Sequence, residues 1–290
     1  MPAEGLLLVD KPAGVTSHDV VNVARRALGE RRVGHAGTLD PFATGLLVVL
    51  VGRATRLIPH VSGDPKVYEA TVRFGIETDT EDLEGLAIRE AAAPTRAAVV
   101  AAIPALTGAL DQVPPAYSAK RIDGRRAYDL ARAGVAVEMR PARVRVDAWE
   151  LLAWRDAADG HPGEAGVRIT CGGGTYIRSL ARDLGRLAGS AAHLSALRRT
   201  RSGAFDVAHA VSLDALRDGT VSLQPARDAV PQWPAQPLDE TDVRRATGGN
   251  LVAATVPGDW AALVSAATGR MVALAQRANE RWQPRVVLHG

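Results

Sequence analysis

Two short apolar runs constrain the fold of this chain more than any other feature of its sequence. Residues 5–10 (GLLLVD) and 46–51 (LLVVLV) consist almost entirely of aliphatic side chains, which is typical of buried strands. Both runs are far shorter than the roughly 20 apolar residues that cross a bilayer. The sequence therefore predicts a sheet with a covered core and no membrane span.

A helix is expected between these two strands. Thr16 or Ser17 can cap its start, and Gly29 would end it. Its apolar face would carry Val20, Val23, Ala24, Ala27 and Leu28.

Further elements follow from periodicity and from breaker residues. Residues 68–76 alternate between apolar and polar side chains, as a half-buried strand does. Residues 95–109 predict a helix that Pro104 would kink or break. The remaining expected elements are strands near 143–154, 166–171 and 203–207, a helix over 175–188, and a short helix that ends at Gly134 after the loop-like VPPAYSAKRIDG.

The order of these elements indicates the fold class. Strands and helices intermix without regular βαβ alternation, so we expect an α+β fold on a mixed or antiparallel sheet. Residues 231–238 (PQWPAQPL) are rich in proline and suggest a linker. The chain of 290 residues would then divide into a domain of residues 1–235 and a small module of residues 236–290.

The cysteine content and the N-terminal sequence favour a reducing cytoplasm. Cys171 is the only cysteine, so no intrachain disulfide can form, and no Cys/His cluster has zinc spacing. The opening residues, MPAEGLLLVDKPAG, lack the basic region of a signal peptide.

The formal net charge of +3 is unevenly distributed. Residues 119–145 hold eight Lys or Arg against three Asp or Glu, and residues 178–201 hold six Arg against Asp183. Residues 77–90 have the opposite balance, with six acids against Arg89. The two basic segments predict either a surface for a polyanion or ordinary solvated helix faces.

The stretch GHAGTLDPFATG, residues 34–45, places one carboxylate, Asp40, among small and flexible residues. Taken alone, an aspartate before proline is more often a turn or cap residue than a catalyst. A metal site would need more ligands, and glycoside hydrolysis would need a second acid. A lone carboxylate suits attack on an electrophilic carbon, such as a sugar C1′ or a pyrimidine C6, and an adjacent arginine would keep it ionised.

Two other segments could supply partners for Asp40. CGGGTYIRSLARDLG places Tyr176 and Arg178 in the first turn of a helix, whose N-terminus favours anions. Arg178 could pair with Asp40 or with a phosphate, or it could be a surface arginine. Tyr68, at the start of an expected strand, could stack on a base or fill the core.

Six ordered segments resemble the bacterial tRNA pseudouridine synthase B family. They are GLLLVDKPAGVTSHDVV, RRVGHAGTLDPFATGLLVVLVGRATRL, KVYEATVRFG, QVPPAYSAKRIDGRRAYDLARAG, CGGGTYIRSLARDLG and HLSALRRTRSGAF. The resemblance is collinear from about Gly5 to Phe205, and VRRATGGNLV beyond Leu238 is similar to part of a shortened PUA module, an RNA-binding β domain. It implies a pseudouridine synthase fold and the isomerisation of uridine 55 in the TΨC arm of tRNA.

The resemblance also implies roles for individual residues. Asp40 matches the catalytic aspartate, Tyr68 the tyrosine that stacks on the target base, and Arg178 the arginine that pairs with the carboxylate. His35 matches the histidine that takes the place of the flipped base. Residues 114–140 match an insertion that clamps RNA. The other substrate-binding positions that the resemblance implies are Tyr176, Leu197, Lys11 and Lys66.

The implied reaction breaks the C1′–N1 bond, rotates the flipped-out uracil and bonds C5 to C1′. Three roles of Asp40 fit it: attack on C1′, attack on C6, or removal of the C2′ proton. The resemblance implies no redox cofactor, metal or nucleotide, and a monomer that acts on the T-arm stem-loop without a protein partner. A non-catalytic RNA-binding protein would need only the basic segments, and a carbohydrate hydrolase would need a second acid near Asp40.

Overall fold

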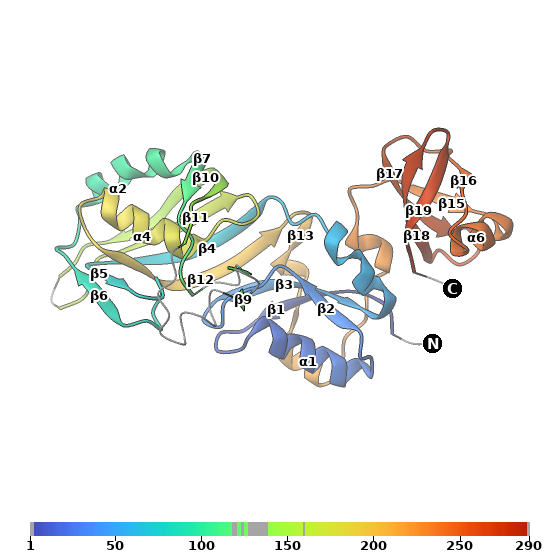
Figure 1. The fold of residues 1–290 in the computed structure, drawn as a ribbon. Helices are drawn as coiled ribbons and strands as arrows, with labels where there is room; N and C mark the ends of the chain where they lie inside the picture. The colour runs from blue at the N-terminus through green and yellow to red at the C-terminus, as the bar shows by residue number, and fades with distance from the viewer. Residues whose placement is uncertain (1–2, 118–120, 123–124, 127–138, 159, 289–290) are drawn as a thin grey trace. The chain divides into compact units, whose positions relative to one another are not determined.

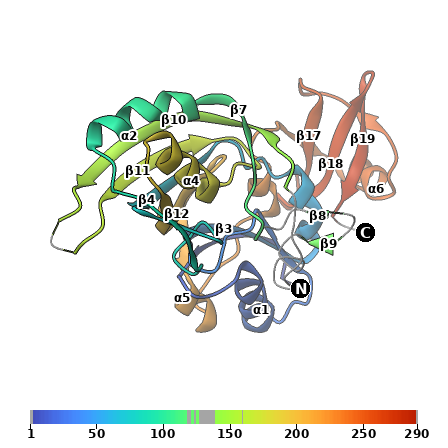
Figure 2. The ribbon, with the colours of Figure 1, turned by 60° about the vertical axis from the view of Figure 1, so that its left-hand side comes forward.

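The computed structural model describes residues 3–117, 121–122, 125–126, 139–158 and 160–288. The chain divides into two compact units, whose helices and strands are labelled in Figures 1 and 2. The first combines residues 1–63 with residues 203–290, and the second consists of residues 64–202. Among the described residues, no helix has the length and apolar character that a membrane crossing requires.

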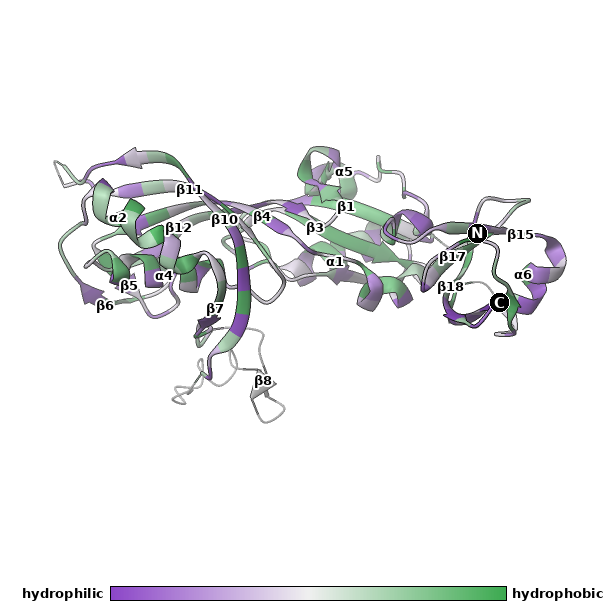
Figure 3. Cartoon of the chain, turned by 90° about the horizontal axis from the view of Figure 1, so that it is seen from above, coloured by the Kyte–Doolittle hydropathy of each residue, from purple (hydrophilic) through white to green (hydrophobic). Residues whose placement is uncertain are grey.

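A small mixed sheet forms the centre of the first unit. Its strands are β1 (Gly5–Lys11), β2 (Val33–Ala36), β3 (Thr44–Val51) and β14 (Val211–Ser212). β1 and β2 pair antiparallel with β3, and β14 pairs parallel with β1. Every residue of β3 after Thr44 is buried, and Figure 3 shows the apolar character of β1 and β3. Both predicted buried strands are confirmed.

One face of this sheet is covered by α1 (Ser17–Leu28). Thr16 caps α1, because its side chain accepts a hydrogen bond from the Asp19 amide while the Asp19 carboxylate accepts one from the Thr16 amide. Gly29 ends the helix with φ of 61°, in the left-handed region that glycine adopts without strain. The predicted helix and both of its ends are confirmed. Its core residues Val20, Val21, Val23 and Ala24 pack with Leu7, Val9, Leu47 and Val49.

The other face of the sheet packs against C-terminal parts of the chain. Leu6, Leu8 and Leu46 share one apolar cluster with Leu274 and Leu288. The short helices of this unit are η1 (Gly52–His60), η3 (Val207–His209), α5 (Leu213–Arg217) and η4 (Ala226–Ala229), and β13 (Phe205–Asp206) precedes η3. Arg53 and Arg56 of η1 donate to the Leu288 and Val287 carbonyls at 3.1 and 2.7 Å.

Five strands near the C-terminus form a second sheet, in the order β15–β17–β18–β19–β16. They are β15 (Ala235–Leu238), β16 (Val252–Ala253), β17 (Trp260–Ser265), β18 (Met271–Ala278) and β19 (Arg281–Val287), and α6 (Glu240–Thr247) packs beside them. Trp282 is fully buried and donates from Nε1 to Gln236 Oε1 at 2.6 Å. The C-terminal β module is thus a folded sheet with its own core.

The predicted linker over residues 231–238 is wrong in its second half. Residues 235–238 form β15, which pairs parallel with β17. β15 lies at the edge of the sheet, so one side of it has no neighbouring strand. Pro237 is tolerated there because its missing N–H would face that side and costs no hydrogen bond between strands.

An antiparallel sheet forms the centre of the second unit, in the order β12–β4–β11–β10–β7. These strands are β4 (Lys66–Phe74), β7 (Gly108–Gln112), β10 (Ala142–Arg155), β11 (Glu164–Cys171) and β12 (Ala192–Ser202). The helix α4 (Ile177–Leu187) packs along β12, and α2 (Arg96–Ala102) lies beside α4 (Figures 1 and 2). The remaining elements are the β5 (Ile76–Thr78) and β6 (Ala87–Glu90) pair, η2 (Ile103–Leu106), and the β8 (Arg121–Ile122) and β9 (Arg125–Arg126) pair.

Several predicted boundaries in this unit need correction. The strand expected over residues 68–76 ends at Phe74, because Gly75 turns the chain with φ of 98° before β5 begins. The helix expected over residues 95–109 breaks at Pro104, as anticipated, and its last residues enter β7. β12 was not predicted. The short helix expected to end at Gly134 lies outside the described residues.

An aromatic cluster holds the end of η1 against the C-terminal module. The His60 ring lies 5.3 Å from the Trp260 ring and 6.1 Å from the Trp233 ring, and the two indoles stack at 5.5 Å between centroids. Burial lowers the pKa of His60 below its ordinary value of 6.5. Protonation of His60 is therefore less favourable in the folded protein than in the unfolded chain.

We predict that His60 makes the protein less stable as the pH falls. Below about pH 6.5 the unfolded chain binds a proton at His60 before the folded protein does, so the free energy of unfolding decreases. Urea unfolding at pH 7.5 and 5.5 should show a smaller pH dependence for His60→Gln than for the wild type. The matched control is His209→Gln, which alters an exposed histidine. An unchanged pH dependence in His60→Gln would contradict the prediction.

Candidate active site

Asp40 lies in the loop between β2 and β3, and two buried side chains fix the backbone on either side of it. Ser17 Oγ accepts a hydrogen bond from the Leu39 amide at 2.9 Å and donates to the Leu39 carbonyl at 3.1 Å. Lys11 Nζ donates to the Pro41 carbonyl at 3.1 Å. The residues directly before and after Asp40 are therefore held by the start of α1 and the end of β1.

Lys11 organises more of the same loop. Its ammonium is fully buried and also donates to the Pro12 and Val15 carbonyls, at 3.0 and 2.7 Å. Carbonyl oxygens supply the acceptors that a buried ammonium requires. The arrangement places a positive charge beneath the Asp40 loop, whereas contact of Lys11 with a substrate stays a prediction.

His35 belongs to the same unit as Asp40. It lies on β2, where it faces Val49 of β3 in the antiparallel register, and its side chain is partly exposed. Only a short loop separates it from Asp40.

The register of the second unit brings Tyr68 and Leu197 to one face of a sheet. Tyr68 on β4 faces Arg199 on β12, and Ala70, two residues further along β4, faces Leu197. Opposite residues of an antiparallel pair share a face, and so do residues two apart on one strand. Tyr68 and Leu197 are each 7% exposed, so both side chains are buried on that face, and their contact with a uracil base stays a prediction.

Lys66 and Tyr176 occupy the ends of two elements in this unit. Lys66 begins β4, faces Cys171 and Ser202 in register, and lies 3.9 Å from the Asp64 carboxylate. Tyr176 is the N-cap residue of α4. Its amide donates to Gln112 Oε1 at 2.9 Å, and its carbonyl accepts from Gln112 Nε2 at 3.0 Å.

Arg178 is buried, so it is not the surface arginine that was one alternative. Its Nη1 donates to the Thr80 carbonyl at 2.8 Å and lies 3.4 Å from Asp82 Oδ2. Its Nη2 donates to the Tyr117 carbonyl at 2.9 Å. The guanidinium orientation is therefore fixed by groups from two loops.

The acidic and basic segments of the sequence pair with each other. Arg178 contacts Asp82, Arg182 contacts Glu81, and Arg186 contacts Glu77. The first two pairs are buried on both sides. The prediction that residues 178–201 form a polyanion surface or a solvated face is therefore wrong for Arg178 and Arg182.

Burial raises the pKa of Glu81, and the nearby charge of Arg182 offsets this effect only in part. Burial alone would lower the pKa of Arg182, but the hydrogen bond to Asp183 and the charge of Glu81 outweigh it and raise that pKa. Burial also raises the pKa of the Cys171 thiol to about 11. Cys171 thus remains protonated and is a packing residue rather than a nucleophile.

The predicted site residues fall into two groups. Asp40, His35 and Lys11 belong to the first unit, and the others, Tyr68, Lys66, Tyr176, Arg178 and Leu197, belong to the second. Each group is internally organised by the contacts above, and the pairing of Asp40 with Arg178 stays a prediction. Sequence reasoning missed Ser17, Gln112 and Glu81 as supports. The acidic run over residues 77–90 was the available signal for Glu81.

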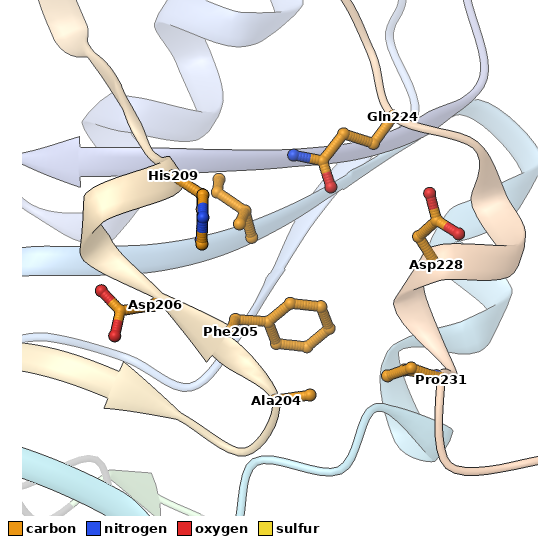
Figure 4. Close-up of a pocket in the computed structure, with 8 residues that line it drawn as sticks. Ala204, Phe205, Asp206, His209, Gln224, Asp228 and Pro231 are labelled. Atoms are coloured by element: carbon orange, nitrogen blue, oxygen red, sulfur yellow. The ribbon is translucent and has the colours of Figure 1, made fainter.

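A cavity of about 420 Å³ opens elsewhere in the first unit (Figure 4). Its lining residues are Leu8, Ala204, Phe205, Asp206, His209, Gln224, Asp228 and Pro231. Asp206 already accepts a hydrogen bond from the Ala208 amide at 2.8 Å as the cap of η3. The cavity contains no residue that the sequence assigned to a site. Within the described part of the chain, no three His, Cys, Asp or Glu side chains gather as a metal site.

Family comparisons account for most of the chain. Residues 25–177 match the family described as TruB family pseudouridylate synthase (N terminal domain). Residues 178–239 match the tRNA pseudouridylate synthase B C-terminal domain.

Relatives of similar length carry one name. The chain is 46% identical over 292 aligned residues to tRNA pseudouridine synthase B of Thermobifida fusca (strain YX), covering 99% of both chains. It is 45% identical to the protein of the same name from Gloeobacter violaceus (strain ATCC 29082 / PCC 7421), covering 98% of this chain and 99% of that one.

Solved structures show the same fold. A chain from an H/ACA RNP bound to a substrate RNA containing 2′-deoxyuridine aligns with a TM-score of 0.69 and 22% identity, covering 99% of this chain and 85% of that one. A chain from a Cbf5-Nop10-Gar1 complex aligns with a TM-score of 0.69 and 24% identity, covering 98% and 84%. The predicted α+β pseudouridine synthase fold with its C-terminal β module is confirmed.

We predict that Ser17→Ala destabilises the protein through the Asp40 loop. The substitution leaves the buried amide and carbonyl of Leu39 without their partner, which costs about 1–3 kcal/mol. Urea unfolding should show that decrease, while Ser222→Ala, which alters an exposed serine, should change the free energy of unfolding by less than about 0.5 kcal/mol. Equal stability of the two variants would contradict the role given to Ser17.

Proposed function

The chain belongs to the TruB family of pseudouridylate synthases, and we propose that it converts uridine to pseudouridine in tRNA, at position 55 of the TΨC arm. The observation that carries the proposal is Asp40 in a loop whose backbone is fixed on both sides by Lys11 and Ser17. The product has the same atoms as the substrate, so the reaction is an intramolecular transfer.

The target uridine must leave the folded loop before the reaction can occur. Flipping costs a few kcal/mol of stacking, and base–aromatic stacking returns about 1–3 kcal/mol. In this proposal Tyr68 supplies the aromatic ring, and His35 fills the position that the base has left. Leu197 and Tyr176 line the uracil pocket, and Lys11 and Lys66 support it.

Asp40 acts on the flipped nucleotide by one of three routes: attack on C1′, attack on C6, or removal of the C2′ proton. Each route leads to cleavage of the C1′–N1 bond, rotation of the uracil and formation of the C1′–C5 bond. In this proposal the C5 proton is then lost with the assistance of Tyr68, and N1 gains a proton. Arg178 pairs with Asp40 in this account and keeps it ionised.

RNA binding is divided between two parts of the chain in this account. Residues 1–235 form the catalytic domain, and its basic segment over residues 114–140 clamps the T-arm. Residues 236–290 form a short PUA-like module that binds RNA. The T-arm stem-loop alone is the substrate, and the enzyme acts in the cytoplasm as a monomer without a protein partner.

Replacing the catalytic carboxylate should abolish turnover and leave RNA binding intact. Asp40→Asn keeps the size of the side chain but removes its charge, so release of tritium from [5-³H]uridine in a T-arm stem-loop should fall below detection. Binding of the same RNA should remain within about twofold of the wild type. Turnover near the wild-type rate would refute the role of Asp40. If Asp40→Asn no longer bound the RNA, the result would indicate a structural role for Asp40 instead of a catalytic one.

Arg178→Lys should be nearly as damaging as a larger change. A lysine keeps the positive charge, but it lacks the planar group that lets Arg178 contact the Thr80 carbonyl, the Tyr117 carbonyl and the Asp82 carboxylate together. We expect kcat to fall about 100-fold or more in steady-state assays. A variant with kcat near that of the wild type would count against an Asp40–Arg178 pair.

A further inference from the structure

The segment from Gln112 to Tyr117 is attached to α4 by three side chains. Gln112 exchanges two hydrogen bonds with the backbone of Tyr176, as described above. Arg182 Nη2 donates to the Val113 carbonyl at 3.1 Å, and Arg178 Nη2 donates to the Tyr117 carbonyl at 2.9 Å. The attachment points on α4 are its N-cap residue and two residues one turn apart.

Each nitrogen of the Arg182 guanidinium has its own partner. Nη1 donates to Glu81, Nη2 to the Val113 carbonyl, and Nε to Asp183 Oδ1 at 2.8 Å. The planar fork of arginine can hold three acceptors in a fixed geometry, which a lysine ammonium on a flexible stem cannot reproduce. We call the turn between β5 and β6, which contains Glu81 and Asp82, the acidic turn. Arg182 therefore links the acidic turn, α4 and the 112–117 segment in one arrangement.

The backbone conformation of Glu81 indicates that neighbouring groups hold this part of the chain in place. It adopts φ of 62°, a left-handed conformation that is uncommon for a residue with a side chain. Its side chain is 6% exposed and also accepts a hydrogen bond from Ser179 Oγ at 2.7 Å. Such strain persists only where neighbouring groups fix the backbone, and it concentrates at functional sites.

Stability alone does not explain a buried ion pair at this position. Replacing buried pairs by packed apolar residues is often neutral or stabilising, because the charges lose their hydration. What the pair provides is a fixed position for the Val113 carbonyl relative to α4. That position matters because Tyr117, four residues further along the same segment, supplies an acceptor for Arg178.

We propose that Arg182, held by Glu81, and Gln112 are positioning residues for the proposed reaction. Their hydrogen bonds hold the 112–117 segment against the first two turns of α4. The segment in turn fixes the positions of the Arg178 guanidinium and the Tyr176 backbone. The inference rests on the proposed function, and neither residue is assigned a contact with the RNA.

Arg182→Lys separates the charge of Arg182 from its geometry. The lysine can still neutralise Glu81 but cannot also hold the Val113 carbonyl. The matched control is Arg186→Lys, one turn further along α4. Arg186 forms an ion pair with Glu77 and, among the described residues, makes no hydrogen bond to the 112–117 segment. A second variant, Gln112→Glu, keeps the side-chain shape and places an oxygen against the Tyr176 carbonyl.

Steady-state assays on a T-arm stem-loop, with melting temperatures measured in parallel, test the proposal. We expect kcat of Arg182→Lys and Gln112→Glu to fall about 10-fold or more, with KM within about threefold of the wild type. Arg186→Lys should retain kcat within about twofold. The folded fraction of each variant at the assay temperature should match that of the wild type.

Two results would overturn the proposal. One is a kcat for Arg182→Lys and Gln112→Glu equal to that of Arg186→Lys. The other is a fall in kcat that tracks loss of folded protein in both variants, which would assign these residues to folding alone. If the wild type itself forms no pseudouridine in the stem-loop, the proposed function fails first, so the two failures are distinguishable.

Discussion

The second unit depends on guanidinium groups that are buried against carboxylates. Arg178 and Arg182 lie on the inner side of α4, and Asp82 and Glu81 face them from the acidic turn. A buried charge is tolerated only when it is paired and hydrogen-bonded, so each pair restricts both elements to one relative placement. The remaining donors of the same arginines bind backbone carbonyls of the 112–117 segment. Three parts of the unit that are distant in sequence thereby become one rigid support.

The first unit uses the same physical rule in a different form. Lys11 is a buried charge whose acceptors are carbonyls, and Ser17 adds two hydrogen bonds to Leu39. The backbone around Asp40 cannot shift without leaving some of these groups unsatisfied, which is costly in a buried site. Polar groups fixed before the reaction begins are the usual source of electrostatic stabilisation in enzymes. In both units, therefore, a proposed catalytic side chain lies next to backbone that buried polar groups hold in place.

Much of the fold could be predicted because its signals are local. The caps of α1 and the apolar runs of β1 and β3 can be identified from a few adjacent residues. β12 was missed because Arg198, Arg199 and Arg201 obscure its alternation, although Arg199 is 1% exposed. The ion pairs between the acidic segment and residues 178–186 span about a hundred residues, so the basic composition alone suggested a polyanion surface or solvated faces. For the site, a motif sufficed for Asp40. Gln112 could not be found in this way, because its role consists of two bonds to the backbone of a distant residue.

We propose that this chain makes one specific modification in tRNA, and mapping the position of the product is the decisive measurement. An unmodified tRNA transcript would be incubated with the purified protein, and pseudouridine located by carbodiimide treatment with primer extension and by mass spectrometry of nuclease fragments. We expect a single pseudouridine, at position 55, that is formed equally well in the isolated T-arm stem-loop. Pseudouridine at other positions, or none in a folded transcript, would contradict it.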